Sequence, residues 1–493
     1  MALEVLNASA GSGKTYNLVQ TYLKLLLSDD HSAGNFAQVM AMTFTNKAAF
    51  EMKERIVLAL DFIANPQSQD PKNKSKALDL INVVSNNLNL KSDIVQKRSK
   101  NALKQILHQF EDFHVMTIDK FNLRLIRSFS KELNIANDFR IVLNEEEVLD
   151  EVVETLLDNI DEHAKTVLTK LVLNYSKEKL EGEESWNFQR ELKKFASILT
   201  NEKYFKQVEN LLQNDFSPEA LQQIKFDIKH IEDLVIEKAA SLYDNFKDID
   251  VSKLPGKSNN TKAFIKLVND KLFEASGDDG GFFTPAMLQN FEKVSDKGDC
   301  YPAEFVTQAL NFQEYYKIQL KEYYLLKESV KNFYNLALLQ FISKELEGVR
   351  SSDHIIRISE FNKLISDLIK DENAPFIYER LGNRFKHFLL DEFQDTSRLQ
   401  WMNIIPLVHE SLANSNDNLI VGDAKQSIYR FKNGLAEQFV ALPEIYNPEL
   451  DKEIAIKSSF FNSQGYKRVL EDNYRSRKHV VQFNNSFFEQ IRS

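Results

Sequence analysis

The chain has 493 residues, enough for roughly three domains of about 150 residues each, and 43% of the residues are hydrophobic and 27% charged. This composition excludes a disulfide-stabilised miniprotein and an intrinsically disordered chain, because it supplies enough apolar surface for packed cores. The formal net charge is −10. The bulk charge therefore gives no general attraction toward phosphate backbones, and any nucleic-acid contact has to come from a local groove.

The cysteine content and the start of the chain indicate a cellular compartment. Cys300 is the single cysteine, so no intrachain disulfide can form, and no Cys/His cluster has the spacing of a structural zinc site. The start of the chain lacks the basic residues of a secretory signal, and no stretch approaches 18 consecutive apolar residues. We therefore expect a cytoplasmic protein that has no membrane partner.

The start of the chain has the pattern strand, turn, helix, strand, helix. Short apolar runs at Leu3–Leu6 and Val39–Phe44 lie on either side of a helical pattern at Leu18–Leu27. Two further buried strands are expected at Phe388–Leu390 and Leu419–Val421, each followed directly by polar and acidic residues. Strands that alternate with helices are typical of a parallel sheet whose faces are covered.

The middle of the chain is helical in its periodicity. Apolar residues recur on one helix face between Leu149 and Ile160, and on another between Leu221 and Val235. Five of the 14 glycines lie between Gly256 and Gly298 and predict long loops there, and the polar segment Pro66–Lys76 predicts another loop. The fold class is therefore α/β, a parallel-sheet domain interrupted by a large all-α insertion.

A glycine-rich stretch follows the first predicted strand and opens a helix. Its residues are Ala8, Ser9, Ala10, Gly11, Ser12, Gly13, Lys14 and Thr15. The two glycines allow the backbone to curl so that successive N–H groups face an anion at the helix N-terminus. In such a loop the lysine places a positive charge on the β and γ phosphates, and the threonine hydroxyl binds Mg²⁺. Ala8 replaces the usual first glycine, but it only begins the loop. This context favours a phosphate-binding loop over an accidental glycine-rich turn.

A later predicted strand ends in two neighbouring acids, Asp391 and Glu392. In phosphoryl transfer a carboxylate at a strand end holds Mg²⁺, and a second acid polarises the attacking water. Neighbouring acids are usually part of a solvated surface, but a strand end in a chain with a phosphate loop favours catalysis. Together with Lys14, these residues predict an ATPase.

Several stretches together resemble one family, the UvrD-like superfamily 1 DNA helicases, and most of all its RecB/AddA branch. They are, in the family's order, the phosphate loop, Thr43–Ile56, Asp391–Thr396, Gly422–Phe431 and Asn473–Ser476. The resemblance implies a RecA-like P-loop NTPase motor domain and an ATP-dependent DNA helicase or translocase that acts in recombinational repair. It implies ATP and Mg²⁺ as cofactors. The implied partners are single-stranded DNA, duplex ends and a partner subunit of a helicase–nuclease complex, and such proteins commonly carry a C-terminal exonuclease domain.

The resemblance also implies roles for individual residues. Gln426 would sense the γ-phosphate, and Arg475 would reach toward it across the cleft between two motor domains. Tyr474 would stack on adenine, as would Tyr16 after the phosphate loop, with ordinary packing as the alternative for either ring. Two sets of residues would contact DNA, because aromatic faces beside lysines suit single strands of any sequence. These sets are Phe44, Thr45, Asn46 and Lys47, and Tyr429, Phe431 and Lys432.

The chain departs from the family pattern at two places. Asp119 stands where the family often has a histidine, which puts any role of that ring in DNA contact or coupling in question. The glutamine with which many members select adenine is not evident in residues 1–7, so base selectivity is expected to be loose. The basic residues between Lys91 and Lys104 could extend a DNA groove, but a solvated helix face is the favoured interpretation.

The resemblance assigns each segment to a domain. Residues 1–145 and 373–465 form motor domain 1A, residues 146–372 form the helical 1B-like insertion, and residues 466–493 begin motor domain 2A. Only 17 residues follow Ser476, too few for the family's last motor motifs, so we expect an N-terminal fragment that unwinds little DNA by itself. The alternative is a catalytically unproductive nucleotide- and DNA-binding scaffold subunit, against which the retained catalytic set argues. A small-molecule phosphotransferase is a weaker alternative.

Overall fold

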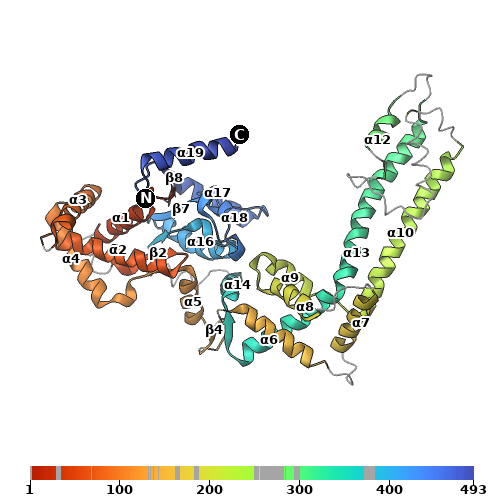
Figure 1. Cartoon of the computed structure of the whole chain (residues 1–493), viewed down its shortest axis with the longest axis horizontal. Helices are drawn as coiled ribbons and strands as arrows, with labels where there is room; N and C mark the ends of the chain where they lie inside the picture. Colours follow the sequence, from red (N-terminus) through yellow and green to blue (C-terminus); the bar gives the residue numbers. More distant parts are fainter. Residues whose placement is uncertain are drawn as a thin grey trace. The chain divides into compact units, whose positions relative to one another are not determined.

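The computed structural model describes residues 3–28, 35–67, 69–131, 133, 135, 136, 138–142, 144–160, 167–181, 188–248, 255, 282, 283, 285–293, 300–370 and 384–492. The five glycines predicted to form loops between Gly256 and Gly298 lie outside the described residues. The chain divides into two compact units. Unit 1 consists of Met1–Glu145, Thr200–Phe205 and Val349–Ser493, and unit 2 consists of Glu146–Leu199 and Lys206–Gly348 (Figure 1).

Unit 1 is built on a parallel sheet of six strands in the order β3-β2-β6-β7-β1-β8. The strands are Leu3–Ala8 (β1), Val39–Thr43 (β2), Val115–Thr117 (β3), His387–Leu390 (β6), Asn418–Gly422 (β7) and Gly465–Leu470 (β8). The predicted α/β class with a parallel sheet is confirmed. In this strand order the carboxyl ends of β6, β7 and β1 lie side by side, so the loops that follow these strands meet at one edge of the sheet.

Helices cover both faces of this sheet, because alternate strand residues point to opposite faces and both sets are apolar. Leu6, Ala41 and Val421 belong to one buried cluster, and Val5, Met42 and Ile420 belong to the other. The first cluster includes residues of Lys14–Leu27 (α1), Asn46–Ala64 (α2), Pro71–Leu88 (α3) and Ser92–His108 (α4). The second includes residues of Ile118–Ser128 (α5), Ile358–Lys370 (α14), Arg398–Ala413 (α16), Ala436–Ala441 (α17) and Lys452–Gln464 (α18).

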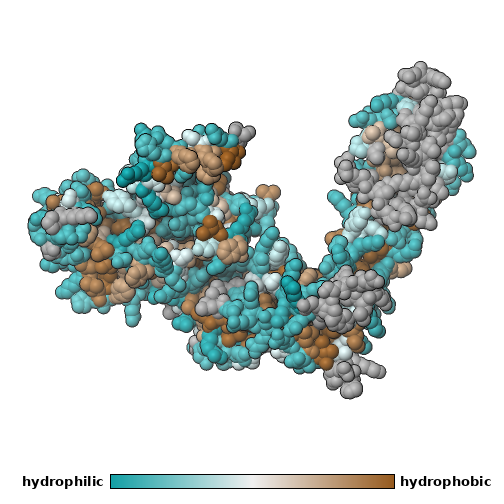
Figure 2. Space-filling view, viewed as in Figure 1, coloured by the Kyte–Doolittle hydropathy of each residue, from teal (hydrophilic) through white to brown (hydrophobic). Residues whose placement is uncertain are grey.

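Unit 1 also contains a small two-stranded parallel sheet of Arg140–Val142 (β4) and Ile355–Arg357 (β5). Its last helix is Lys478–Arg492 (α19), over which Figure 2 shows apolar side chains gathered at the surface. The exposed residues of this helix are Val480, Phe483, Phe487, Phe488 and Ile491. Short 3-10 helices occupy several loops, including Glu202–Tyr204 (η4), Phe393–Asp395 (η5), Ala424–Gln426 (η6) and Arg430–Lys432 (η7).

The secondary-structure elements described in unit 2 are all helices. Its helices are Glu145–Asp158 (α6), Val167–Glu181 (α7), Phe188–Ala196 (α8), Phe205–Leu212 (α9), Pro218–Phe246 (α10), Pro285–Phe291 (α12) and Ala303–Ser352 (α13), with α6, α9 and α13 extending a few residues past the unit's bounds. The two predicted apolar faces are buried at Val152 and Val153 and at Ile231 and Val235. Helices α10 and α13 run side by side (Figure 1) and share a core rich in aromatic rings. None of the described helices combines the length and apolarity that a membrane crossing requires.

The predicted segment boundaries differ from the described units. Strand β5 and helix α14 were expected within the insertion, but they belong to unit 1, because β5 pairs with β4 and Phe361 of α14 packs into the core of the sheet. Thr200–Phe205 also belongs to unit 1. The boundary predicted at residue 466 cuts through β8, which pairs with β1 along its whole length. The end of the first sheet therefore lies after Leu470.

Candidate functional site

The glycine-rich loop joins β1 to α1. Gly11 and Gly13 have φ angles of 82° and 95°, in the left-handed region that residues with a Cβ atom rarely adopt. The Ser9 carbonyl accepts hydrogen bonds from the Ser12 backbone N–H at 3.1 Å and from its hydroxyl at 2.7 Å, which closes a tight turn. Gly13 is the N-cap of α1, so Lys14 is the first residue of that helix. The loop thus ends on a free helix N-terminus, the arrangement that favours anions.

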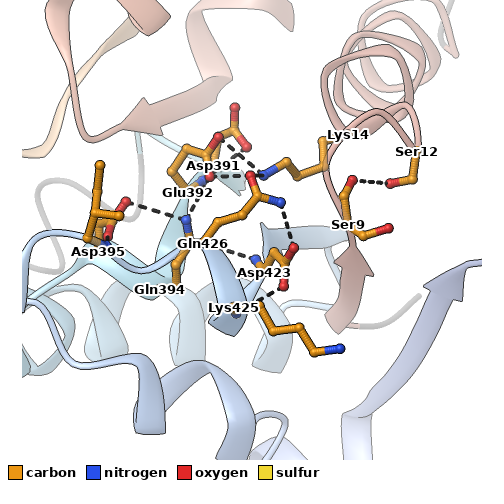
Figure 3. A network of polar contacts seen from close by, with 11 residues as sticks. Ser9, Ser12, Lys14, Asp391, Glu392, Gln394, Asp395, Asp423, Lys425 and Gln426 are labelled. Atoms are coloured by element: carbon orange, nitrogen blue, oxygen red, sulfur yellow. Dashed lines mark hydrogen bonds and ion pairs between the residues drawn. The ribbon is translucent and has the colours of Figure 1, made fainter. Parts of the chain in front are cut away.

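Lys14 lies at the centre of a polar network at the carboxyl edge of the sheet (Figure 3). Its Nζ is 3.1 Å from Glu392 Oε2 and 3.1 Å from Gln426 Oε1. The Lys14 side chain is only 11% exposed, and that of Glu392 is 33% exposed. The three residues follow β1, β6 and β7, which are neighbours in the sheet. Three residues predicted to be catalytic are therefore in direct contact.

Asp391 is the most strongly perturbed acid of this network. Burial, and to a lesser extent the adjacent Glu392 carboxylate, raises the pKa of Asp391 to about 6. Its Oδ1 accepts a hydrogen bond from the Glu392 backbone N–H at 3.0 Å. Glu392 has a φ of 51°, so the backbone leaves the strand conformation between the two acids. A nearby cation would favour the charged form of Asp391 and lower this pKa.

Asp391 and Thr15 are the residues that could hold Mg²⁺. Thr15 is half-buried and is the second residue of α1. Within the described part of the chain, no group of three or more His, Cys, Asp or Glu side chains could hold a metal ion by itself. Mg²⁺ usually keeps several waters and binds one or two protein oxygens together with substrate phosphates. One carboxylate and one hydroxyl fit a Mg²⁺ ion that is shared with a nucleotide.

Two residues that the sequence interpretation left without a role organise this network. Gln394 Nε2 donates to Glu392 Oε2 at 2.7 Å, and Gln394 Oε1 accepts from the Asp423 backbone N–H at 2.9 Å. Asp423 in turn accepts from Gln426 Nε2. A Cβ atom on Gly422 would lie 2.7 Å from Gln394 Oε1, so a larger residue there would displace the Gln394 amide from this network. Gln394 and Asp423 both lie in the stretches that resemble the family motifs, and this position was the sequence signal that could have identified them as site residues.

The residues expected near an adenine ring lie at the surface. Tyr16 is 57% exposed and Tyr474 is 78% exposed, and among the described residues no ring contact joins them. The Tyr474 hydroxyl donates to Asp472 at 3.2 Å, and this carboxylate raises the pKa of Tyr474. Arg475 is exposed, and no ion pair links its guanidinium to Glu392 within the described residues. The segment 473–475 nevertheless contacts the phosphate loop through other atoms.

The two predicted DNA-contact sets meet in one aromatic cluster, formed by Phe44, Tyr429, Phe431 and Lys432. The rings of Phe44 and Tyr429 are 4.7 Å apart between centroids, and those of Tyr429 and Phe431 are 5.9 Å apart. Lys432 Nζ lies 5.7 Å from the centre of the Tyr429 ring. Phe431 is 77% exposed. Segments nearly 400 residues apart thus present aromatic faces and a cation together.

The other members of the first set lie beside this cluster. Asn46 and Lys47 are exposed at the start of α2. The Thr45 hydroxyl accepts a hydrogen bond from the Ala48 backbone N–H at 3.2 Å and so caps α2. Asn46 and Lys47 are therefore open to a ligand, whereas the Thr45 oxygen already has a structural partner.

Asp119, which stands where the family often has histidine, forms a hydrogen bond within unit 1. Its Oδ1 accepts a hydrogen bond from Gln400 Nε2 at 3.1 Å. Gln400 also forms the capping box of α16 with Ser397. Burial raises the pKa of Asp119. This side chain therefore serves the packing of α5 against α16.

The basic residues between Lys91 and Lys104 divide into two kinds. Arg98 donates to the Leu27 carbonyl at 2.7 Å and so satisfies the C-terminal end of α1. Lys91, Lys97, Lys100 and Lys104 are exposed. The lysines match the solvated helix face that the sequence analysis favoured, and the arginine is structural.

Comparison with known proteins agrees with this geometry. Residues 4–447 match the family model of the UvrD/REP helicase N-terminal domain. Similar curated proteins, each named as a subunit of an ATP-dependent helicase/nuclease, come from Clostridium novyi (24% identical over 99% of this chain), Bacillus pumilus (25% over 98%) and Lactobacillus johnsonii (26% over 99%). The chain spans 38% of the length of each of these relatives.

The matched range contains the phosphate loop, both acids after β6, Gln426 and the aromatic cluster. It also covers most of the chain. The chain therefore belongs to the UvrD/REP helicase N-terminal domain family.

Proposed function

We propose that this chain is the N-terminal motor region of an ATP-dependent DNA helicase, which couples ATP hydrolysis to movement along single-stranded DNA during recombinational repair. The contact of Lys14 with Glu392 and Gln426 carries this proposal. These residues are far apart in the sequence, and phosphoryl transfer uses a phosphate-binding cation together with groups that orient the attacking water. The names of the relatives support a role within a helicase–nuclease complex that has a partner subunit.

ATP with Mg²⁺ is the proposed ligand of the loop edge. The N–H groups of the loop and α1 would bind phosphate oxygens, and Thr15 and Asp391 would hold the metal ion. Bound Mg²⁺–ATP supplies the γ-phosphoryl group and a positive charge that stabilises its transfer. Lys14 would exchange the Glu392 carboxylate for phosphate oxygens, since both are anions that its ammonium group can bind.

This exchange would leave Glu392 free to act on water. Its carboxylate would then remain oriented by Gln394 Nε2, which lies at 2.7 Å. A carboxylate held in this way can accept a hydrogen bond from a water molecule and align it with the phosphoryl group. Gln426, linked to both Lys14 and Asp423, would report the state of the γ-phosphate to the segment that leads to Tyr429.

We further propose that unit 1 is the RecA-like first motor domain and unit 2 its helical insertion. The segment after Leu470 would begin the second motor domain, from which Arg475 would reach the γ-phosphate and Tyr474 the adenine ring. The aromatic cluster would grip single-stranded DNA, because any base can stack on an exposed ring such as Phe431 while lysines follow the phosphates. Local positive charge would then suffice despite the net charge of −10.

The test is ATP turnover by the full-length protein with single-stranded DNA present. We expect Lys14→Ala and Glu392→Gln to lose turnover by 100-fold or more, roughly 3 kcal/mol in barrier height, because each removes a group that acts on the transferred phosphoryl or its water. Lys24→Ala is the matched control, since Lys24 lies on the same helix α1 and its side chain is 51% exposed. Full turnover in both site variants would refute the assignment of the site. Turnover that is absent from the wild type as well would favour the scaffold alternative.

A further inference from the structure

The segment that follows β8 is attached to the outside of the phosphate loop by two hydrogen bonds. Asn473 Nδ2 donates to the Ala10 carbonyl at 3.2 Å. The backbone N–H of Tyr474 donates to the Gly11 carbonyl at 2.9 Å. Both carbonyls belong to the turn between β1 and α1, where neither strand nor helix provides them with a partner. The conformation of the loop is therefore fixed partly by residues more than 460 positions away.

These bonds determine where the N–H groups of the loop point. In a trans peptide the C=O and N–H bonds point in opposite directions. Because the Ala10 carbonyl points at Asn473, the Gly11 N–H of the same peptide unit points to the other side of the loop. The Ser12 N–H is already bound to the Ser9 carbonyl at 3.1 Å. The contact from Asn473 thus leaves the Gly11 N–H directed away from this segment and available to an anion.

The segment after β8 packs so closely against the phosphate loop that residue 11 has to be a glycine. A Cβ atom on Gly11 would lie 2.6 Å from Arg475 Cβ and 2.9 Å from Asn473 Oδ1. Such distances are far below van der Waals contact, and the positive φ of Gly11 adds to the strain of any larger residue. Gly11 is therefore required by the seating of this segment as well as by the turn itself.

Asn473 has a second function within its own segment. Its Oδ1 accepts hydrogen bonds from the backbone N–H groups of Arg475 at 3.0 Å and Ser476 at 2.9 Å. This is the geometry of an Asx turn, which fixes the backbone of the residues after the asparagine. One amide group thus binds the phosphate loop through its nitrogen and shapes the segment that carries Tyr474 and Arg475 through its oxygen.

We propose that Asn473 is a positioning residue of the nucleotide site, whose amide nitrogen holds the phosphate loop in its anion-binding shape. The proposal rests on the proposed nucleotide-binding function of the loop. The hydrogen bonds of Asn473 connect the loop to the segment that carries Tyr474 and Arg475, the residues expected to contact adenine and the γ-phosphate. Without the nitrogen donor the Ala10 carbonyl loses the bond that orients the Ala10–Gly11 peptide, and nucleotide binding has to restore this orientation.

The experiment compares Asn473→Asp with the wild type in the full-length protein. Aspartate keeps the oxygen that accepts from Arg475 and Ser476, but it places a second oxygen opposite the Ala10 carbonyl in place of the donor. We expect the dissociation constant of a fluorescent ADP analogue to rise about tenfold in Asn473→Asp, because the donor is lost at this exposed position and a negative charge is added beside the phosphate loop. Asn473→Ser removes the donor without adding charge, and its dissociation constant is expected to rise severalfold. The midpoint of thermal unfolding without nucleotide is expected to stay close to that of the wild type.

Asn447→Asp is the matched control. Asn447 Nδ2 donates to the Asp451 carbonyl at 2.8 Å and its Oδ1 accepts from the Asp451 backbone N–H at 3.0 Å, so it has the same double role in a different loop. This variant is expected to bind nucleotide as the wild type does. An equal affinity of Asn473→Asp and Asn447→Asp would overturn the proposal.

The failure of the proposal is separable from failure of the proposed function. If the wild type binds nucleotide and Lys14→Ala does not, the nucleotide site is established whatever Asn473→Asp does. Asn473→Ser separates loss of the donor from the added charge and also serves if Asn473→Asp lowers the unfolding midpoint, because a serine hydroxyl is neutral, can still accept from its own turn and is too short to reach Ala10. A wild-type affinity in Asn473→Ser would then refute the role of Asn473.

Discussion

Asp391 shows how a buried acid can lower the stability of a protein and still suit its chemistry. Its pKa is raised from the ordinary 3.8 to about 6 by burial and by Glu392, although Lys14 lies nearby and acts in the opposite direction. At neutral pH the side chain is therefore ionised at a cost to the folded state. A bound divalent cation would offset this destabilisation, because its charge favours the ionised form of Asp391.

The first prediction concerns the stability of the protein without nucleotide. Between about pH 4 and pH 6 the folded protein holds a proton on Asp391 that the unfolded chain has released, so this group lowers the free energy of unfolding as the pH rises. Asp391→Asn, which keeps an acceptor for the Glu392 N–H, should therefore raise the free energy of unfolding at pH 7.5 by an amount on the order of 2–3 kcal/mol, and the unfolding midpoint should rise with it. The gain should shrink at pH 4.5. Differential scanning fluorimetry of the full-length protein measures both midpoints.

Asp451→Asn provides the control for this measurement. Asp451 is the exposed N-cap of α18, a position where asparagine caps about as well as aspartate, so its midpoint should not change at either pH. A midpoint of Asp391→Asn that equals or falls below that of the wild type at pH 7.5 would show that the ionised carboxylate is not destabilising.

At the scale of elements, the strongest sequence predictions were those with a local physical cause. The strands predicted at Phe388–Leu390 and Leu419–Val421 were recognisable because a strand buried on both faces is a continuous apolar run. Strand β3 has only three residues, and β8 has the mixed sequence Gly465–Leu470 with mostly exposed side chains. β3 is too short for its buried apolar residues to show a strand pattern and β8 has no such pattern, but each pairs with a neighbouring strand of the sheet.

The loop predicted at Pro66–Lys76 was wrong in its second half. Helix α3 begins at Pro71, with the Asp70 side chain accepting from the Asn73 N–H at 2.8 Å. Proline at the first helical position after an aspartate is a helix start, because proline lacks only an N–H that the first turn would leave unpaired. The polar composition of the segment concealed this capping signal.

The residues of the aromatic cluster were predicted from the sequence, but their arrangement in space could not be predicted. The sequence placed Phe44 and Tyr429 in separate motifs, but the contact between their rings depends on the return of the chain to the sheet at β6 and β7. Stacking of bases on exposed rings is worth about 1–3 kcal/mol for each base. The cluster should therefore supply much of the affinity for a single strand.

The second prediction tests the cluster directly. Phe431→Ala should weaken binding of a labelled oligothymidylate to the full-length protein by roughly ten- to hundredfold, with no loss of stability, because the ring is 77% exposed. Fluorescence anisotropy titrations measure the affinity. Phe50→Ala is the control, since Phe50 is a ring of similar exposure, 68%, on α2. Equal affinities for the two variants would remove the cluster from the proposed DNA path.

At the scale of the whole molecule, the sequence predicted an α/β domain interrupted by helices. The residues at which the two units begin and end could not be predicted. Periodicity separates helical from α/β blocks, but it cannot show that Thr200–Phe205 is part of unit 1 or that β4 pairs with β5 across more than 200 residues. These are long-range contacts of short segments, for which the local sequence has no pattern. Gln394 and Asp423 lie in recognisable motifs, but their roles depend on contacts between segments that follow different strands.

The net charge of the whole chain does not describe the local charge at the site. A net charge of −10 describes the entire surface, whereas the proposed ligands meet Lys14, Lys47 and Lys432 at one edge of unit 1. Binding of both nucleotide and DNA is then a local property, and it should weaken steeply with salt for DNA. Coupling between the two ligands is the property that distinguishes a motor from a plain ATPase.

The stimulation of ATP turnover by single-stranded DNA therefore tests the central claim most directly. With full-length protein and saturating Mg²⁺–ATP, the proposed motor should hydrolyse ATP at least tenfold faster when oligothymidylate is added, because DNA on the aromatic cluster acts on the segment that carries Gln426. Phe431→Ala should need a higher DNA concentration for half of the effect. Turnover that is rapid without DNA and unchanged by its addition would contradict the account.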